Sequence, residues 1–541
     1  MTFDFYQLKN HILNDSLNDW FNIVHQKHNH YLPDQPNRFL IELDKQKTEY
    51  KQKLIDELCS KYAQYILKDQ NQDQVQSSIQ KNQKYIFMNS QLYHKDYNIN
   101  VQPDLIIHRD IFKEIFDEIE DEDLPEYIIL DILYNILHFT SDKNDILNQG
   151  NMYYSKCKIA LATICITNNR YGYFIGKEYR HKNKTLEKKK TIGKYKIDQE
   201  YFDTIQDSIE WLKKLNRNYD NWVILPKPSV KELYPNMNQK CGQWITEKKK
   251  LADKIHEITL VWNISYKKRC ILMDKGITQW SDPVLLSNIY PYQIKENQRE
   301  LIQDKMIEIN KQTELLITPR RIKDLDFISK IKDQKNSIIL DIESVVSLDE
   351  NESYFETIEG TTDKPRICIL GTILNKEPYI FKDFTIKYLT NEEEKKIILY
   401  WVDYLYKQFQ QTPIQVYHWG NAEKLYLQYM KGKYPDINYP QFNCIDLLVY
   451  FKQEPISIQG CFGYGLKEIV KQLYNFKLIE NEWKDDIDGL NAMIQIIQTS
   501  EEAQLKRIPI KRYSIIKKII YYNYMDCRVI VDILKLLQRM V

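Results

Sequence analysis

Residues Ser337–Val346, SIILDIESVV, decide how the rest of this 541-residue chain is interpreted. Apolar residues lead into Asp341-Ile342-Glu343, and two valines follow one residue later. Residues two apart in a strand project from the same face, so Asp341 and Glu343 would present two carboxylates together. Neighbouring carboxylates repel one another unless a positive charge separates them, and a divalent cation commonly does so. A surface strand with an acidic outer face is the alternative interpretation.

The composition is that of a globular protein with several domains. The chain is 43% hydrophobic and 28% charged, and 76 Lys+Arg against 75 Asp+Glu leave a net charge of +1. A chain of this length exceeds a single hydrophobic core, so about two to four domains are expected. Because the net charge is close to zero, any surface that binds nucleic acid must be a local one.

The cysteines and the N-terminal residues indicate the compartment. Nine cysteines are scattered without any C-x-x-C pair, which gives no support for a zinc ribbon, a redox motif or an iron–sulfur cluster. Free thiols are typical of a reducing compartment. The first residues lack the apolar core of a signal peptide, and no apolar run approaches the length of a membrane span. We expect an intracellular protein of the cytoplasm or nucleus that is neither secreted nor bound to a membrane.

The N-terminal third alternates between strands and a helix. Strands are predicted at Val101–Ile107 and Tyr127–Leu133, a helix at Met152–Thr167, and a third strand at Tyr171–Ile175. Asp104 lies in the first of these strands and Asp131 in the second. This order resembles the PD-(D/E)XK nuclease core of the RecB type, which uses two acids for a divalent metal and a lysine for the attacking water.

The catalytic residues of that family are incomplete in this sequence. Leu133 stands at the lysine position, Cys157 and Leu161 stand at the Gln and Tyr positions of the helix, and Lys51 stands near the expected upstream Glu. The resemblance therefore implies a degenerate site at Asp104 and Asp131 and a fold retained for binding. Two acids at strands of an ordinary α/β domain are the alternative, and an active site here would need another lysine.

Two basic clusters are candidate contacts for nucleic acid. The run Lys182–Lys196 includes Lys188, Lys189 and Lys190, and a second cluster is Lys267, Lys268 and Arg269. Lysine density is enough to contact phosphates without a fixed geometry. A solvated charged face is the alternative for both clusters.

Further acidic motifs follow the Asp341-Ile342-Glu343 strand in a regular order. They are YHWGNAE at residues 417–423, Asp446-Leu447-Leu448, Gly465-Leu466-Lys467, and a final helix that carries Tyr522 and Asp526. Tyr522 and Asp526 are four residues apart, so they share one helix face. The whole set resembles the DEDD 3′–5′ exonuclease superfamily, and most closely its YprB-like, ribonuclease H-like branch.

The resemblance implies a site and a chemistry. Asp341, Glu343, Glu423 and Asp526 would hold two Mg²⁺ or Mn²⁺ ions, and Tyr522 would orient or deprotonate the attacking water. Glu423 replaces an Asp of the family pattern and His418 replaces an Asn. Either change weakens activity or marks a subfamily that works in this way. Glu423 is alternatively a glutamate at a helix start, where the helix dipole favours it. A helix is predicted to begin within Cys444–Leu448, and Asp446 is expected to cap it.

We therefore predict an α/β protein with three parts. Residues 1–240 form a degenerate, restriction-endonuclease-like α/β domain, residues 241–334 a helical connector, and residues 335–541 an RNase H-like domain with a mixed sheet flanked by helices. The predicted function is a metal-dependent 3′–5′ exonuclease that acts on DNA or RNA, with single-stranded ends as its expected partner. The alternative is a catalytically inactive scaffold that binds nucleic acid in replication or repair.

Overall fold

The chain folds into two compact α/β units. This computed structural model describes residues 2–541 except 29, 37, 82, 117–123, 144, 168, 183, 187–190, 240–241, 291–297, 313, 333–335, 347–364, 411–412 and 483–488. The described residues up to 255 belong to the first unit and those from 256 onward to the second. Residues 256–334, which the sequence assigned to a separate connector, thus lie within the second unit, and the three-part division stays a prediction.

The first unit is built around a seven-stranded mixed sheet. Its strand order is β10-β8-β7-β6-β3-β2, with β9 paired to β8, and a separate three-stranded sheet has the order β1-β5-β4. The strands are β1 (Phe3–Asp4), β2 (Ile66–Lys68), β3 (Ile86–Met88), β4 (Leu92–His94), β5 (Ile99–Val101), β6 (Leu105–His108), β7 (Tyr127–His138), β8 (Tyr171–His181), β9 (Lys184–Leu186) and β10 (Gly193–Lys196).

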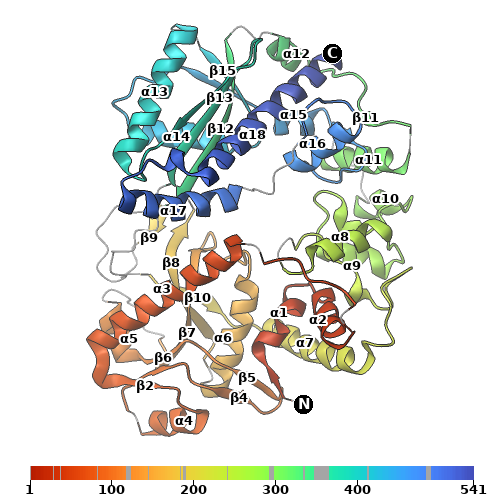
Figure 1. Cartoon of the computed structure of the whole chain (residues 1–541). Helices are drawn as coiled ribbons and strands as arrows, with labels where there is room; N and C mark the ends of the chain where they lie inside the picture. The colour runs from red at the N-terminus through yellow and green to blue at the C-terminus, as the bar shows by residue number, and fades with distance from the viewer. Residues whose placement is uncertain are drawn as a thin grey trace. The chain divides into compact units, whose positions relative to one another are not determined.

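Helices surround this sheet, and α3 and α6 matter most for the site (Figure 1). Leu54 and Leu58 of α3 share one hydrophobic core with residues of β6 and β7. The helices are α1 (Lys9–Ile12), α2 (Leu17–His28), α3 (Arg38–Tyr62), α4 (Gln72–Gln80), α5 (Arg109–Ile115), α6 (Met152–Ile166), α7 (Gln199–Asn218) and α8 (Ile245–Lys254).

The second unit contains a five-stranded sheet with the order β14-β13-β12-β15-β16. Strand β12 pairs antiparallel with β13 and parallel with β15, while β13–β14 is antiparallel and β15–β16 is parallel. A two-stranded sheet joins β11 and β17. The strands are β11 (Ile317–Thr318), β12 (Ser337–Val346), β13 (Pro365–Leu374), β14 (Phe381–Thr385), β15 (Ile414–His418), β16 (Phe442–Asp446) and β17 (Ser457–Ile458).

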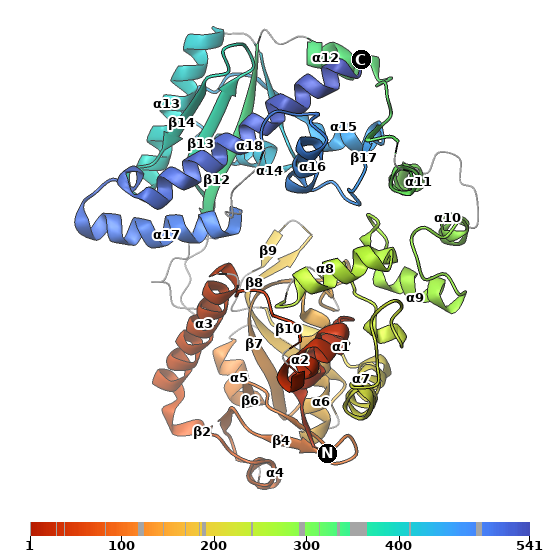
Figure 2. The ribbon, with the colours of Figure 1, turned by 45° about the vertical axis from the view of Figure 1, so that its right-hand side comes forward.

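Helices cover both faces of the five-stranded sheet, with α13 on one side and α18 on the other (Figures 1 and 2). The helices of this unit are α9 (Tyr266–Asp274), α10 (Leu285–Ile289), α11 (Gln298–Lys311), α12 (Leu325–Lys332), α13 (Asn391–Phe409), α14 (Ala422–Lys433), α15 (Leu447–Gln453), α16 (Leu466–Asn475), α17 (Gly489–Lys506) and α18 (Ser514–Arg539).

The alternation along β12 divides the core into two layers. Leu340 and Ile342 pack into the cluster that contains Trp401 of α13, whereas Ile339 packs into the cluster that contains Ile530 of α18. Asp341 and Glu343 follow Ile339 at intervals of two, so they face the α18 side of the sheet. The fold therefore directs the acidic pair toward the last helix of the chain.

Several predicted elements are confirmed, and two differ. Strands β7 and β8, helix α6 and strand β12 appear where the patterns place them. The strand predicted at Val101–Ile107 is divided, because Val101 ends β5, Leu105 begins β6, and Asp104 lies in the bend before β6. Residues 444–448, however, do not begin a helix, because Phe442–Asp446 forms the strand β16 and the helix α15 starts only at Leu447. Asp446 caps that helix as predicted, since its side chain accepts from Leu448 N.

Among the described residues, no helix combines the length and the apolar character that crossing a bilayer requires.

Candidate metal centre

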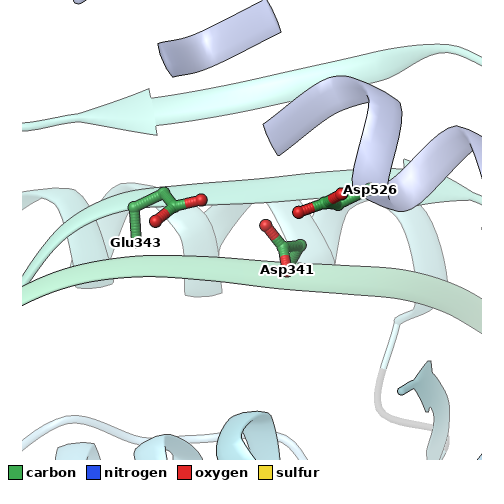
Figure 3. A group of neighbouring side chains, drawn as sticks. All are labelled: Asp341, Glu343 and Asp526. Atoms are coloured by element: carbon green, nitrogen blue, oxygen red, sulfur yellow. The ribbon is translucent and has the colours of Figure 1, made fainter. Parts of the chain in front are cut away.

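Three carboxylates of the second unit meet between β12 and α18. Asp341 and Glu343 project from the strand and Asp526 projects from the helix, with the three side chains directed into one space (Figure 3). One carboxylate oxygen of each residue lies within 4.8 Å of those of the other two. Asp341 and Glu343 are two residues apart in the sequence and Asp526 follows more than 180 positions later, and the fold brings the three together.

Burial makes this acidic trio unstable as three bare anions. Burial raises the pKa of Asp341 to about 7. Burial, with the neighbouring carboxylates adding to it, raises the pKa values of Glu343 and Asp526 well above their ordinary range. A protein that keeps three carboxylates this close needs either protons or a cation in the same space.

An amide and a glycine hold Asp341 in place. Asn523 Nδ2 on α18 donates a 2.6 Å hydrogen bond to Asp341 Oδ2. Gly371 is the partner of Asp341 in the β12–β13 pairing, and a Cβ atom there would come within 1.6 Å of Asn523 Oδ1. Because residue 371 has no side chain, the Asn523 side chain of α18 can lie against β13 at this point.

Glu423 lies beside the trio, at the start of α14. It is 7% exposed, and burial together with the charge of Asp341 raises its pKa to about 8. The ordinary glutamate of a helix start faces solvent, so burial near Asp341 favours the predicted role as a fourth acid. Its membership of the metal set stays a prediction, because only Asp341, Glu343 and Asp526 form the close trio.

His418 supports the turn before Glu423. Its Nδ1 donates a 2.6 Å hydrogen bond to Gly420 O and lies 3.6 Å from Glu423 Oε2. Burial lowers the pKa of His418, so the ring is neutral at neutral pH. Gly420 N in turn donates to Asp446 Oδ1 at 2.9 Å, which ties the turn to the cap of α15.

Tyr522 and Lys467 complete the surroundings of the trio. Tyr522 hydrogen-bonds to Asp526, and burial together with the neighbouring carboxylates raises the pKa of the phenol above its usual value. Lys467 Nζ on α16 lies 5.0 Å from the centre of the Tyr522 ring. Its positive charge partly offsets the rise in the pKa values of Glu343 and Asp526.

The donor set fits a hard divalent cation. All the candidate ligand atoms are carboxylate oxygens, which Mg²⁺ and Mn²⁺ prefer. Within the described part of the chain, Asp526 Oδ1 and Glu423 Oε2 are buried without a hydrogen-bond partner. Buried polar atoms normally have partners, so these two oxygens are available to a cation.

The acidic pair of the first unit is arranged differently. Asp131 Oδ1 accepts from Asp104 N at 3.0 Å, and Asp104 Oδ2 accepts from Ile132 N at 2.9 Å. Lys51 Nζ of α3 reaches Asp104 Oδ1 at 2.5 Å, and Lys158 Nζ of α6 reaches both oxygens of Asp131 at 2.9 and 2.7 Å. Two lysines thus reach the acidic pair, which is the condition that the sequence places on an active site in the first unit.

The sequence did not identify these two lysines as partners of the pair. Lys51 was noted only for standing where the resemblance expects an acid, and Lys158 follows Cys157, the position compared with Gln. Asn523 was also missed, although it lies between Tyr522 and Asp526 in the sequence. Helical periodicity could have placed Lys158 on the sheet side of α6, but its carboxylate partner depends on the tertiary fold.

One of the predicted nucleic-acid contacts is wrong. Arg269 is 2% exposed, and its guanidinium pairs with the buried Glu257 at 3.2 Å, so it faces the core. Lys267 is exposed on α9 and Lys268 is partly buried. Lys188, Lys189 and Lys190 lie outside the described residues.

Comparison with known proteins adds no assignment. No protein-family model matches the sequence, and none of the characterised proteins compared with it gives a significant match.

Proposed function

We propose that this protein is a metal-dependent nuclease that hydrolyses phosphodiester bonds of DNA or RNA, as a 3′–5′ exonuclease. The single observation that carries the proposal is the trio of partly buried Asp341 with buried Glu343 and Asp526, whose ligand atoms lie within 4.8 Å of one another. A trio of carboxylates raised in pKa and enclosed by the fold is better suited to divalent cations than to a purely structural role.

The sheet topology supports an RNase H-like assignment for the second unit. Three successive strands are antiparallel, the next two are parallel to the first of them, and the order is β14-β13-β12-β15-β16. The first acids lie on the central strand and the last acid lies on the C-terminal helix. This placement agrees with the DEDD resemblance that the motifs suggested.

The acids would bind the metal ions, and Tyr522 would orient the attacking water. Asp341, Glu343 and Asp526, with Glu423, would hold Mg²⁺ or Mn²⁺. Divalent ions at such a site activate a water molecule and stabilise the charge that develops on the phosphate. Because the pKa of Tyr522 is raised, its phenol keeps its proton and would orient the attacking water through a hydrogen bond.

The alternative, an inactive nucleic-acid-binding scaffold, is favoured by one observation in the first unit. Lys51 and Lys158 pair with Asp104 and Asp131, so both aspartates already have a cationic partner. The same lysines also meet the condition for an active site in this unit, and the substitution Asp131→Asn separates the two cases. We therefore propose that catalysis belongs to the second unit and that the first unit serves binding or assembly.

The direct test is incubation of the purified protein with end-labelled single- and double-stranded DNA and RNA, with Mn²⁺ and with chelator. We expect trimming from the 3′ end, release of nucleoside 5′-monophosphates, and loss of activity by at least about a hundredfold in Asp341→Asn and Asp526→Asn. Asp403→Asn, an exposed acid on α13, is the matched control and should retain activity.

Two results would contradict the proposal. Trimming that survives Asp341→Asn but is lost in Asp131→Asn would move the site to the first unit. Absence of digestion with any substrate, in a protein that still binds nucleic acid, would favour the scaffold.

A further inference from the structure

Helix α18 carries a stripe with two tyrosines between cationic side chains, exposed at its first two members and partly buried at the other three. Their spacing of three, four and seven residues places them on one helix stripe. At 1.5 Å per residue the row extends over about 27 Å. We call it the α18 row, and its members are Lys517, Tyr521, Tyr524, Arg528 and Lys535.

Ring contacts connect the row to the segment that enters β14. Tyr521 and Tyr524 have ring centroids 5.9 Å apart, and Tyr524 lies 5.3 Å from Phe381. Further along, Arg528 and Lys535 lie over the ring of Tyr379 at 5.2 and 4.6 Å. The row therefore presents two neighbouring tyrosines, with one cationic side chain before them and two after them.

The aromatic surface of the row is open to solvent at one end. Tyr521 is 55% exposed, and Ile380, between Tyr379 and Phe381, is 57% exposed. The exposed ring of Tyr521 offers an aromatic face on which an unpaired base can stack. Lys517, four residues earlier on the helix, is exposed as well.

Acidic residues offset only part of this charge. Lys535 lies 3.7 Å from Glu377, and Arg528 lies 4.0 Å from Glu480, and these two glutamates are largely exposed. Exposed ion pairs contribute little and are readily exchanged. Asp532 is buried and stays paired with Arg528 at 3.6 Å. The row thus remains able to attract an anion, mainly at Lys517.

The row adjoins the candidate metal centre through Gly371. A Cβ at Gly371 would come within 1.6 Å of Asn523 Oδ1 and within 3.0 Å of Phe381 Cε2. Asn523 holds Asp341, whereas Phe381 contacts Tyr524 of the row. Tyr521 and Tyr522 are also consecutive, one on the row and the other beside Asp526. The same turn of α18 therefore contributes residues both to the α18 row and to the surroundings of the candidate metal centre.

We infer that the α18 row binds a single-stranded polynucleotide, which it leads toward the metal centre. Every base has an aromatic face, so stacking on Tyr521 and Tyr524 requires unpaired bases and no particular sequence. Lys517 and Lys535 are spaced to contact the phosphates between them. A duplex keeps its base faces stacked inside and would gain only the phosphate contacts. The choice of ligand rests on the proposed function.

The test measures binding without cleavage. Fluorescence anisotropy of labelled oligo(dT), oligo(U) and a blunt duplex is recorded with the full-length protein in chelator, over a series of salt concentrations. Lys517→Ala/Tyr521→Ala should bind both single strands at least about fivefold more weakly. Loss of the lysine should make the slope of log K against log salt shallower by about 0.7. Duplex affinity should change less.

The matched control lies on the helix that covers the other face of the sheet. Tyr400 of α13 is 54% exposed and Lys407 is exposed, so Tyr400→Ala/Lys407→Ala removes the same chemistry away from the row. This control should bind as the unaltered protein does. Because Tyr521 is largely exposed, its replacement by alanine should not alter the melting curve. Lys517→Glu is a second variant, which reverses the charge at that position.

Three results would overturn binding of a single strand by the α18 row. Equal affinity of the row variant and the unaltered protein, an equal loss in the α13 control, or no affinity of the unaltered protein for either strand would overturn the inference. In the last case a protein partner would have to cover the row. Binding that depends on the row, without any trimming in Mn²⁺, would uphold the row and reject the nuclease. The oligo(dT) and oligo(U) arms separate DNA from RNA.

Discussion

At the residue scale, Gly371 is the most informative position outside the acids themselves. Gly371→Ala would place a Cβ within 1.6 Å of Asn523 Oδ1, so Asn523 must move and Asp341 loses its 2.6 Å hydrogen bond. We expect a loss of about 1–3 kcal/mol in the free energy of unfolding and weaker Mn²⁺ binding. Denaturant titration and calorimetric metal titration measure the two effects.

Gly432 provides the control for this substitution. It lies in α14, and a Cβ there meets no atom within 4 Å. Gly432→Ala should be neutral or stabilise by up to about 1 kcal/mol, because alanine favours the helix. Equal behaviour of the two variants would contradict the close packing of Gly371 against Asn523.

The raised pKa values predict how metal binding depends on pH. Burial raises the pKa of Asp341 to about 7 and, with the charge of Asp341, that of Glu423 to about 8. A bound cation requires deprotonated acids, so binding should release protons, and Mn²⁺ affinity should rise by up to about tenfold per pH unit for each proton released. Titration calorimetry in two buffers of different ionisation enthalpy counts these protons.

The same pKa values fix the sign of the stability change in the absence of metal. The folded protein holds these protons more tightly than the unfolded chain, whose carboxyl pKa values are about 4. Its free energy of unfolding should therefore fall as the pH rises from about 5 to about 8, and Mn²⁺ should reverse the fall. Asp341→Asn should flatten the dependence. A chelated protein whose melting temperature rises over this range would contradict the burial of the acids.

The sequence predicted which residues belong to the site only where they form a local pattern along a strand or a helix. Asp341 and Glu343 alternate on a strand, and Tyr522 and Asp526 share a helix face, so their orientation follows from backbone periodicity. Asn523 has no such signal, because an amide in a helix is ordinary until its carboxylate partner is known. Arg269 looked like a surface charge because its partner Glu257 lies twelve residues away, across a turn.

At the scale of elements, α3 and α6 each bring a lysine to the strands of the first unit. Asp131 is 4% exposed and Lys158 Nζ contacts both of its oxygens, so removal of the lysine leaves a buried charge without its partner. Lys158→Met should destabilise the first unit by about 3 kcal/mol. Lys158→Met/Asp131→Asn should recover much of that loss, as a double-mutant cycle in denaturant would show.

A surface ion pair of the same unit is the control. Lys196 and Asp198 are both more than half exposed and 3.4 Å apart, so Lys196→Met should cost less than about 1 kcal/mol. Nuclease activity should not change in either lysine variant if the second unit is catalytic. A Lys158→Met protein as stable as the unaltered one would show that Asp131 does not depend on this lysine.

The elements themselves were largely predictable, and β16 shows where the limit lies. Within Phe442–Asp446 only Asn443 is exposed and only Ile445 is buried, and the helix α15 follows without a gap. Such a short strand at the edge of the sheet has no clear periodicity of its own to detect. Strand β12 was clear because apolar residues surround its acids on a central strand.

At the scale of the whole molecule, each unit has its own core. The three core clusters of the second unit draw only on residues from 258 onward, while the cluster built on β6 and β7 draws only on residues 50–192. A domain with its own hydrophobic core can fold alone. The proposed catalytic acids and the α18 row both lie in the second unit.

A fragment of residues 256–541 should therefore fold and carry the proposed chemistry by itself. We expect a cooperative thermal transition and, with Mn²⁺, 3′-end trimming at a rate within about tenfold of the full chain, abolished by Asp526→Asn. Circular dichroism and the end-labelled assay provide the measurements. Asp131→Asn in the full chain should leave the rate unchanged, since no catalytic residue of the proposal lies before residue 341. A folded fragment without activity, beside an active full chain, would mean that the first unit contributes to catalysis or to substrate binding after all.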